Sequence, residues 1–127
     1  MRLKLSFALF ALAVVLAACG SSGSPAASSG GAPGGAAAAT VTITDAAFPG
    51  RFEPGTVNIK VGQSVHFTSQ STVAHSVKWN DSGIPTSGII NQGDAGYTTP
   101  VFTTAGTFAY ICGIHGASMS GTIVVQP

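Results

Sequence analysis

Apolar and polar residues alternate in short runs from residue 40 to the C-terminus, and Gly, Pro, Asn and Asp separate the runs. Such alternation is typical of strands that bury one face, and the separating residues are typical of turns. A helical period is suggested only within residues 84–96. The strands predicted in this way cover residues 41–44, 56–61, 64–68, 75–79, 97–102, 106–112 and 120–125.

The predicted fold class is therefore all-β, with about seven to eight short strands. Strands with one apolar face bury it when two sheets pack together, and Greek-key connections are common in such proteins. We predict a Greek-key β-sandwich. The large apolar side chains expected to fill its core are Phe48, Phe52, Val57, Ile59, Val65, Phe67, Val77, Trp79, Phe102, Phe108, Tyr110, Ile123 and Val125.

The N-terminal segment has a different pattern. Arg2 and Lys4 precede an apolar run of twelve residues from Phe7 to Ala18. A charged region followed by an apolar region is typical of a signal peptide. As a helix, the run would be about 18 Å long, too short for a hydrocarbon core of about 30 Å. Residues 1–18 are therefore interpreted as a signal peptide that exports the protein.

The apolar run ends in Leu16-Ala17-Ala18-Cys19, followed by Gly20. This ending resembles the lipobox of bacterial lipoproteins, in which cleavage leaves the cysteine first and its thiol carries diacylglycerol. The alternative is an ordinary secretory signal that happens to end in a cysteine. We expect Cys19 to carry a lipid, because cysteine is scarce in this chain and Cys19 lies where the motif requires it. Two acyl chains with an N-terminal acyl group would then anchor the protein stably in a membrane.

Residues 20–39 contain only Gly, Ser, Ala and Pro. Such a composition favours a flexible tether, whose twenty residues would span an r.m.s. distance of about 25 Å. The predicted organisation is a signal peptide (1–18), a lipidated cysteine with its tether (19–39) and one folded domain (40–127). The domain would lie on the outer face of the cell membrane or in the periplasm, on the outer membrane if the host has one.

The charge and cysteine content of residues 40–127 restrict the functions that this stretch can have. This stretch contains three basic and four acidic side chains, so it is nearly neutral. Without a basic stripe, nucleic-acid binding is not expected. Cys112 is the one cysteine of this stretch, so the domain cannot form an internal disulfide. A lone thiol outside the cytosol is exposed to oxidation unless something binds it, which first suggests a metal.

Cys112, His115 and Met119 lie within eight residues, between two predicted strands. A thiolate, two imidazoles and a weakly bound thioether are the ligands of electron-transfer copper, whereas zinc prefers four stronger ligands. The second imidazole can come from His75, which follows the loop of residues 69–74 and so can lie at the same end of the sandwich. His66 alternates with apolar neighbours, so we expect it to face solvent.

The motifs around these residues resemble those of the small cupredoxins, the family of plastocyanin, amicyanin and pseudoazurin. The resemblance runs over nearly the whole domain, includes the Cys112–Met119 loop and ends at Val125. It implies one type 1 copper ion held by His75, Cys112, His115 and Met119, with His75 buried and His115 near the surface. The three residues between His115 and Met119 are one fewer than in plastocyanin and one more than in amicyanin. The matching segments are Phe52-Glu53-Pro54, residues 61–67, Ala74-His75-Ser76-Val77, residues 106–115 and residues 119–125.

The expected function is that of a monomeric single-electron carrier whose redox partner proteins dock near His115, beside Gly116 and Ala117. No general acid, nucleophile or open substrate site is evident, so we do not expect an enzyme. One alternative is a copper-binding or copper-delivery lipoprotein without a redox partner. A metal-free adhesion module is a further alternative, but it would leave Cys112, His115 and Met119 unexplained.

Overall fold

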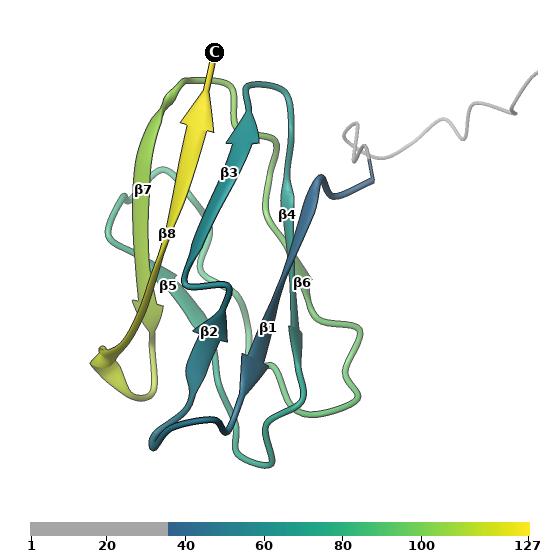
Figure 1. Ribbon diagram of the computed structural model, residues 1–127, viewed down its shortest axis with the longest axis vertical. Coiled ribbons are helices and arrows are strands. Elements are labelled where there is room, and N and C mark those ends of the chain that lie inside the picture. Colours follow the sequence, from purple (N-terminus) through teal and green to yellow (C-terminus); the bar gives the residue numbers. More distant parts are fainter. Residues whose placement is uncertain (1–35) are drawn as a thin grey trace, which may run out of the picture.

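The structure, a computed structural model, describes residues 36–127, so the predicted signal peptide, Cys19 and most of the tether lie outside the described residues. The described part consists of strands and loops (Figure 1). Its strands are β1 (Ala39–Thr44), β2 (Arg51–Glu53), β3 (Thr56–Lys60), β4 (Val65–Ser69), β5 (Val77–Trp79), β6 (Tyr97–Thr98), β7 (Gly106–Cys112) and β8 (Gly116–Gln126).

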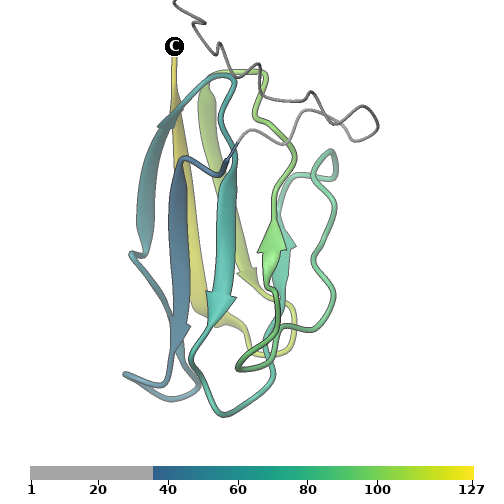
Figure 2. The same cartoon turned by 90° about the vertical axis from the view of Figure 1, so that its right-hand side faces the viewer.

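The strands form two four-stranded sheets packed face to face (Figures 1 and 2). One sheet has the order β2-β1-β4-β6 and the other the order β3-β8-β7-β5. The sheets are mixed, because β1 runs parallel to β4 and β3 parallel to β8 while the other pairs are antiparallel. The prediction of an all-β sandwich is confirmed.

Some details of the predicted strands were wrong. The short strand β2 was missed, since Phe48-Pro49-Gly50 and Pro54-Gly55 on either side of it indicated turns. Residues 84–96 contain no helix; their one β-type contact is a bridge between His75 and Ile90. Within residues 36–127, no helix is long and apolar enough to cross a membrane.

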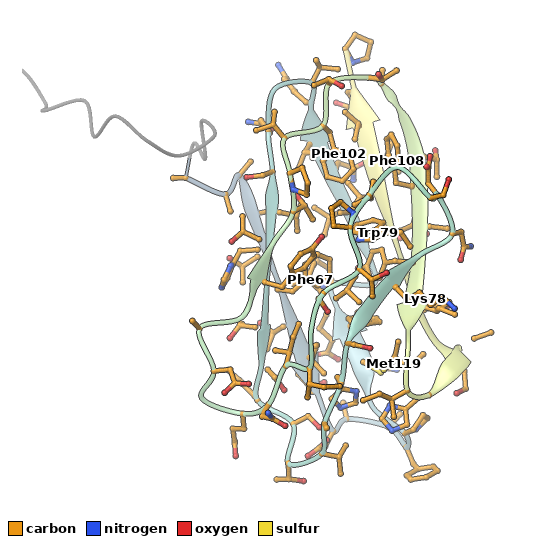
Figure 3. The ribbon with its side chains drawn as sticks, turned by 180° about the vertical axis from the view of Figure 1, so that it is seen from behind. Phe67, Lys78, Trp79, Phe102, Phe108 and Met119 are labelled. Atoms are coloured by element: carbon orange, nitrogen blue, oxygen red, sulfur yellow. The ribbon has the colours of Figure 1, made fainter. Side chains whose placement is uncertain are left out.

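Aromatic side chains from both sheets meet in the core. The ring of Phe67 packs edge-on against Tyr110, with centroids 5.2 Å apart, and against Trp79 at 6.2 Å. Figure 3 shows Phe67 and Trp79 in the middle of the sandwich. Among the predicted core residues Phe108 is half-buried and Phe48 is fully exposed, so the prediction for Phe48 was wrong. Phe48 lies in a loop outside the alternating strands, where no sheet covers it.

Three loops meet at one end of the sandwich: residues 45–50 after β1, residues 70–76 after β4, and residues 113–115 between β7 and β8 (Figures 1 and 2). Met119 lies toward this end, whereas Phe102 and Phe108 lie toward the other (Figure 3). The sandwich thus brings together residues 45, 75 and 115, which are far apart in the sequence.

Candidate metal centre

Three of the predicted ligands come together at this end of the sandwich. Cys112 is the last residue of β7, His115 lies in the turn to β8, and His75 lies in the loop before β5. One ligand atom of each lies within 4.8 Å of the others. β7 pairs Cys112 with Val77 of β5, two residues after His75, and this pairing brings the two ligands together. The backbone of His75 also bonds to Ile90 in both directions, which holds His75 in place.

The distances between these side chains fit one bound metal ion. Sγ of Cys112 lies 3.7 Å from Nδ1 of His75 and 3.3 Å from Nδ1 of His115. A metal bound to a thiolate at about 2.3 Å and to an imidazole nitrogen at about 2.0 Å holds the two atoms roughly 3.6 Å apart. The same nitrogen, Nδ1, faces the sulfur in both rings, so all three donors point into one space.

Burial favours the protonation state that a metal needs. The side chains of Cys112 and His75 are fully buried. Desolvation lowers the pKa of His75, and the neighbouring His115 lowers it further. The neutral imidazole, the form that binds a metal ion, is therefore favoured at this position.

Met119, the fourth predicted ligand, is buried at the same end. It lies on β8, which begins at Gly116, and the expectation that it lies in the loop was therefore wrong. Together with Gly50 it borders a surface cleft. Gly50 in turn touches the ring of His75, since a Cβ on Gly50 would lie 2.9 Å from its Cε1 atom. Gly50 thus packs close to His75 and also lines the cleft that Met119 borders.

The remaining histidine and the exposure of His115 agree with the expectations from the sequence. His66 is partly exposed on β4, and its Nδ1 lies 2.9 Å from the hydroxyl of Thr98, apart from the metal cluster. His115 is half-buried while His75 is inaccessible. The site therefore reaches solvent through one imidazole.

This donor set favours copper over zinc. It offers one thiolate, two imidazoles and a nearby thioether, and a soft sulfur-rich set with a weak fourth ligand suits copper that changes its oxidation state. Structural zinc sites are usually completed by a fourth strong ligand from cysteine, histidine or a carboxylate. In the part of the chain that the structure describes, the cluster of His75, Cys112 and His115 includes no carboxylate.

Comparison with known families also indicates a copper site. A family model described as copper binding proteins, plastocyanin/azurin family, matches residues 37–126. The chain belongs to the plastocyanin/azurin family. Copper, the cofactor predicted from the sequence, is the metal of this family, and the resemblance to cupredoxins is confirmed.

Individual relatives in the plastocyanin/azurin family are moderately similar in sequence. The chain is 35% identical over 86 residues to the chloroplastic plastocyanin of Tetradesmus obliquus. It is 33% identical over 85 residues to the plastocyanin of Scenedesmus fuscus. Each match covers 59% of this chain, but the chain spans 58% of the first relative and 86% of the second.

Solved cupredoxin structures share the fold. An oxidised amicyanin variant superposes with a TM-score of 0.58 at 26% identity, covering 70% of this chain and 82% of that one. The purple cupredoxin of Nitrosopumilus maritimus gives a TM-score of 0.57 at 24% identity, covering 69% of this chain and 99% of that one. These matches support the two-sheet cupredoxin architecture.

Sequence reasoning missed several residues around the site. Gly50 and Phe48 belong to the loop after β1, and Ser71 forms a hydrogen bond with His75. Asp45 accepts hydrogen bonds from the Ser71–Thr72 segment. No motif marks these residues: Ser71 contacts His75 within one loop, and Asp45 and Gly50 reach that loop from the loop after β1. The one available signal was the pair of serines close before His75, which is compatible with a side chain hydrogen bond to the ring.

Proposed function

We propose that this protein is a single-electron carrier with one type 1 copper ion bound by His75, Cys112, His115 and Met119. The convergence of Cys112 Sγ with the two Nδ1 atoms, in a family that binds copper, is the observation that carries this proposal. The bound ion would supply the electron by alternating between Cu(I) and Cu(II). We propose no enzymatic activity for this site.

The protein's own contribution is to hold the donors in one arrangement. His75 and Cys112 are fully buried. Cys112 lies on β7, which pairs with β5, and His75 is held by its bridge to Ile90. Donors that are already placed need little movement when an electron arrives or leaves. The buried ring also excludes water from one side of the site. The half-buried His115 is then the shortest route between the site and a partner protein.

Copper delivery without a redox partner is the rival function, and one experiment separates the two. We expect the copper-loaded protein to pass through repeated one-electron reduction and reoxidation while keeping its metal in the presence of a Cu(I) chelator. Preplaced ligands should bind both oxidation states, so the visible absorption should return fully after each cycle. Loss of copper to the chelator on the first reduction would contradict the electron-carrier proposal and favour delivery.

Partner proteins would dock on an apolar surface around His115. Phe48 is fully exposed, and Val73 and Ile114 are each about half exposed. Phe48, Val73 and His115 line one surface depression, and Ile114 is next to His115 in the chain. Exposed aromatic side chains are favourable anchors for a protein interface. The contact surface thus extends beyond the predicted Gly116 and Ala117 to the loop after β1.

Electron self-exchange between oxidised and reduced copies tests this surface with the protein alone. Phe48→Ser should slow self-exchange about tenfold, corresponding to about 1.4 kcal/mol, with the reduction potential unchanged. The control Val61→Ser removes an exposed apolar side chain in the turn between β3 and β4, away from the three loops, and should have no effect. Because the domain is nearly neutral, the rate should depend weakly on ionic strength. Equal rates for wild type and Phe48→Ser would contradict docking at this surface.

We further propose that the protein is exported and is anchored in a membrane through Cys19. The support is the lipobox-like ending Leu16-Ala17-Ala18-Cys19 and the Gly/Ser/Ala/Pro composition of residues 20–39. An anchored domain on a tether can reach partners within a limited distance of the membrane. The family match begins at residue 37, which is compatible with a tether before a separate domain.

The test of the anchor is fractionation of cells that produce the full chain. Wild type should be found with the membrane fraction and carry a lipid-sized mass increase on an N-terminal cysteine. Cys19→Ser should remove that modification and leave the protein unprocessed or free of the membrane. Wild-type protein recovered in soluble form with an unmodified Cys19 thiol would contradict the proposal.

A further inference from the structure

The buried ligand His75 has a hydrogen-bond partner on the side away from the metal cluster. Its Nδ1 faces Cys112, while its Nε2 lies 2.8 Å from Oγ of Ser71. Ser71 is itself fully buried. Gly50 packs against the same side of the ring, where a Cβ would lie 3.3 Å from Nε2. The ring is therefore confined between Cys112, Gly50 and Ser71.

Ser71 connects this ring to a carboxylate. Its hydroxyl donates a hydrogen bond to Oδ1 of Asp45, the residue after β1. The other oxygen of Asp45 accepts hydrogen bonds from the backbone N–H of Thr72 at 2.9 Å and from the Thr72 hydroxyl at 3.0 Å. The hydrogen bond from Ser71, followed by that from the Thr72 backbone, lowers the pKa of Asp45. The carboxylate is thus held in its ionised form.

The direction of these hydrogen bonds indicates which nitrogen of His75 carries the proton. An ionised carboxylate only accepts, and a serine hydroxyl has a single hydrogen to give. The carbonyl of Val73 is a competing acceptor, but it is neutral and lies 3.3 Å from Oγ of Ser71. Because the hydrogen of Ser71 goes to Asp45, its oxygen accepts from Nε2–H of His75. The lone pair of the neutral ring is then on Nδ1, facing Cys112.

We propose that Ser71 and Asp45 are positioning residues that hold the proton of His75 on Nε2, present Nδ1 to copper and stabilise Cu(II) relative to Cu(I). The inference deepens the proposed function and rests on it for the role of copper. A partner that accepts from the outer N–H of a ligand imidazole orients the ring and makes it a stronger donor. The negative charge behind Ser71 favours the more positive oxidation state of the metal.

Asp45→Asn is the sharpest variant, because Asp45 is exposed and the amide has nearly the same shape as the carboxylate. An amide oriented to accept from Thr72 would turn its NH2 group toward Ser71. The Ser71 hydroxyl would then be free to donate to His75, which favours the proton on Nδ1 and competes with the metal. Ser71→Ala removes the hydroxyl that links Asp45 to His75. Asp81→Asn is the matched control, since this exposed carboxylate follows β5 in a loop near Phe102 and Phe108, at the other end of the sandwich.

Nitrogen-15 NMR of the metal-free protein should show His75 as the Nε2–H tautomer in wild type and Asp81→Asn, with a shift toward Nδ1–H in Asp45→Asn. In the copper-loaded protein, Asp45→Asn and Ser71→Ala should lower Cu(II) affinity about 10- to 100-fold, lower Cu(I) affinity less, and so raise the reduction potential. Asp81→Asn should change neither of the two copper affinities nor the reduction potential.

Two results would overturn the inference. One is a wild-type His75 that carries its proton on Nδ1 in the metal-free protein. The other is an equal loss of Cu(I) and Cu(II) affinity in Asp45→Asn, which leaves the potential unchanged and shows that Asp45 only supports the loop. Failure of the proposed function would be seen separately, as wild-type protein that does not retain copper through redox cycles while the tautomer result is unaffected.

Discussion

The burial of an imidazole against a thiol, His75 against Cys112, is the constraint on which the rest of the site depends. Both side chains are inaccessible to solvent, and polar groups buried in an apolar sandwich are costly unless each one has a partner. Nε2 of His75 has Ser71 as its hydrogen-bond partner, and Nδ1 faces Sγ of Cys112, where a metal ion would bind. A metal ion bound to the sulfur and both Nδ1 atoms would complete this set of partners. The hydrogen bond to Ser71 and the bonds to a metal ion would offset the cost of burying this pair in a small core.

The sandwich makes this burial possible and also limits access. β7 carries Cys112 inward against β5, and the turn to β8 brings His115 back over the sulfur. The loop after β1 contributes twice: the buried Gly50 and the exposed Asp45 support His75, directly and through Ser71, and Phe48 lies on the surface near His115. One loop thus links the inner support of the metal ligands to the surface where a partner would dock. An electron carrier needs both a fixed site and a short route to its partner.

The alternation of residues along the chain predicted the sandwich, most strands and most of the core, because a period of two residues directly reports burial on one face. It missed β2, where turn residues enclose three strand residues, and it assigned Phe48 to the core. The cluster of Cys112, His115 and Met119 could be predicted because its members are close in the sequence and chemically unusual. Asp45 and Gly50 could not, because the loop after β1 meets the loop of Ser71 and His75 only after folding. Ser71 is close to His75 in the sequence, but a serine at that distance is too common to mark a contact with the ring.

Absorption spectroscopy of the Cu(II)-loaded protein tests the central claim, that Cys112 and its neighbouring imidazoles bind a type 1 copper ion, most directly. Wild type should bind one copper per chain and develop an intense blue band from thiolate-to-copper charge transfer, since one thiolate is bound to the metal. Cys112→Ala should lose the band, and His66→Ala should keep it, because His66 bonds to Thr98 away from the site. A colourless wild-type complex, or a blue band that disappears with His66, would contradict the assignment of the site.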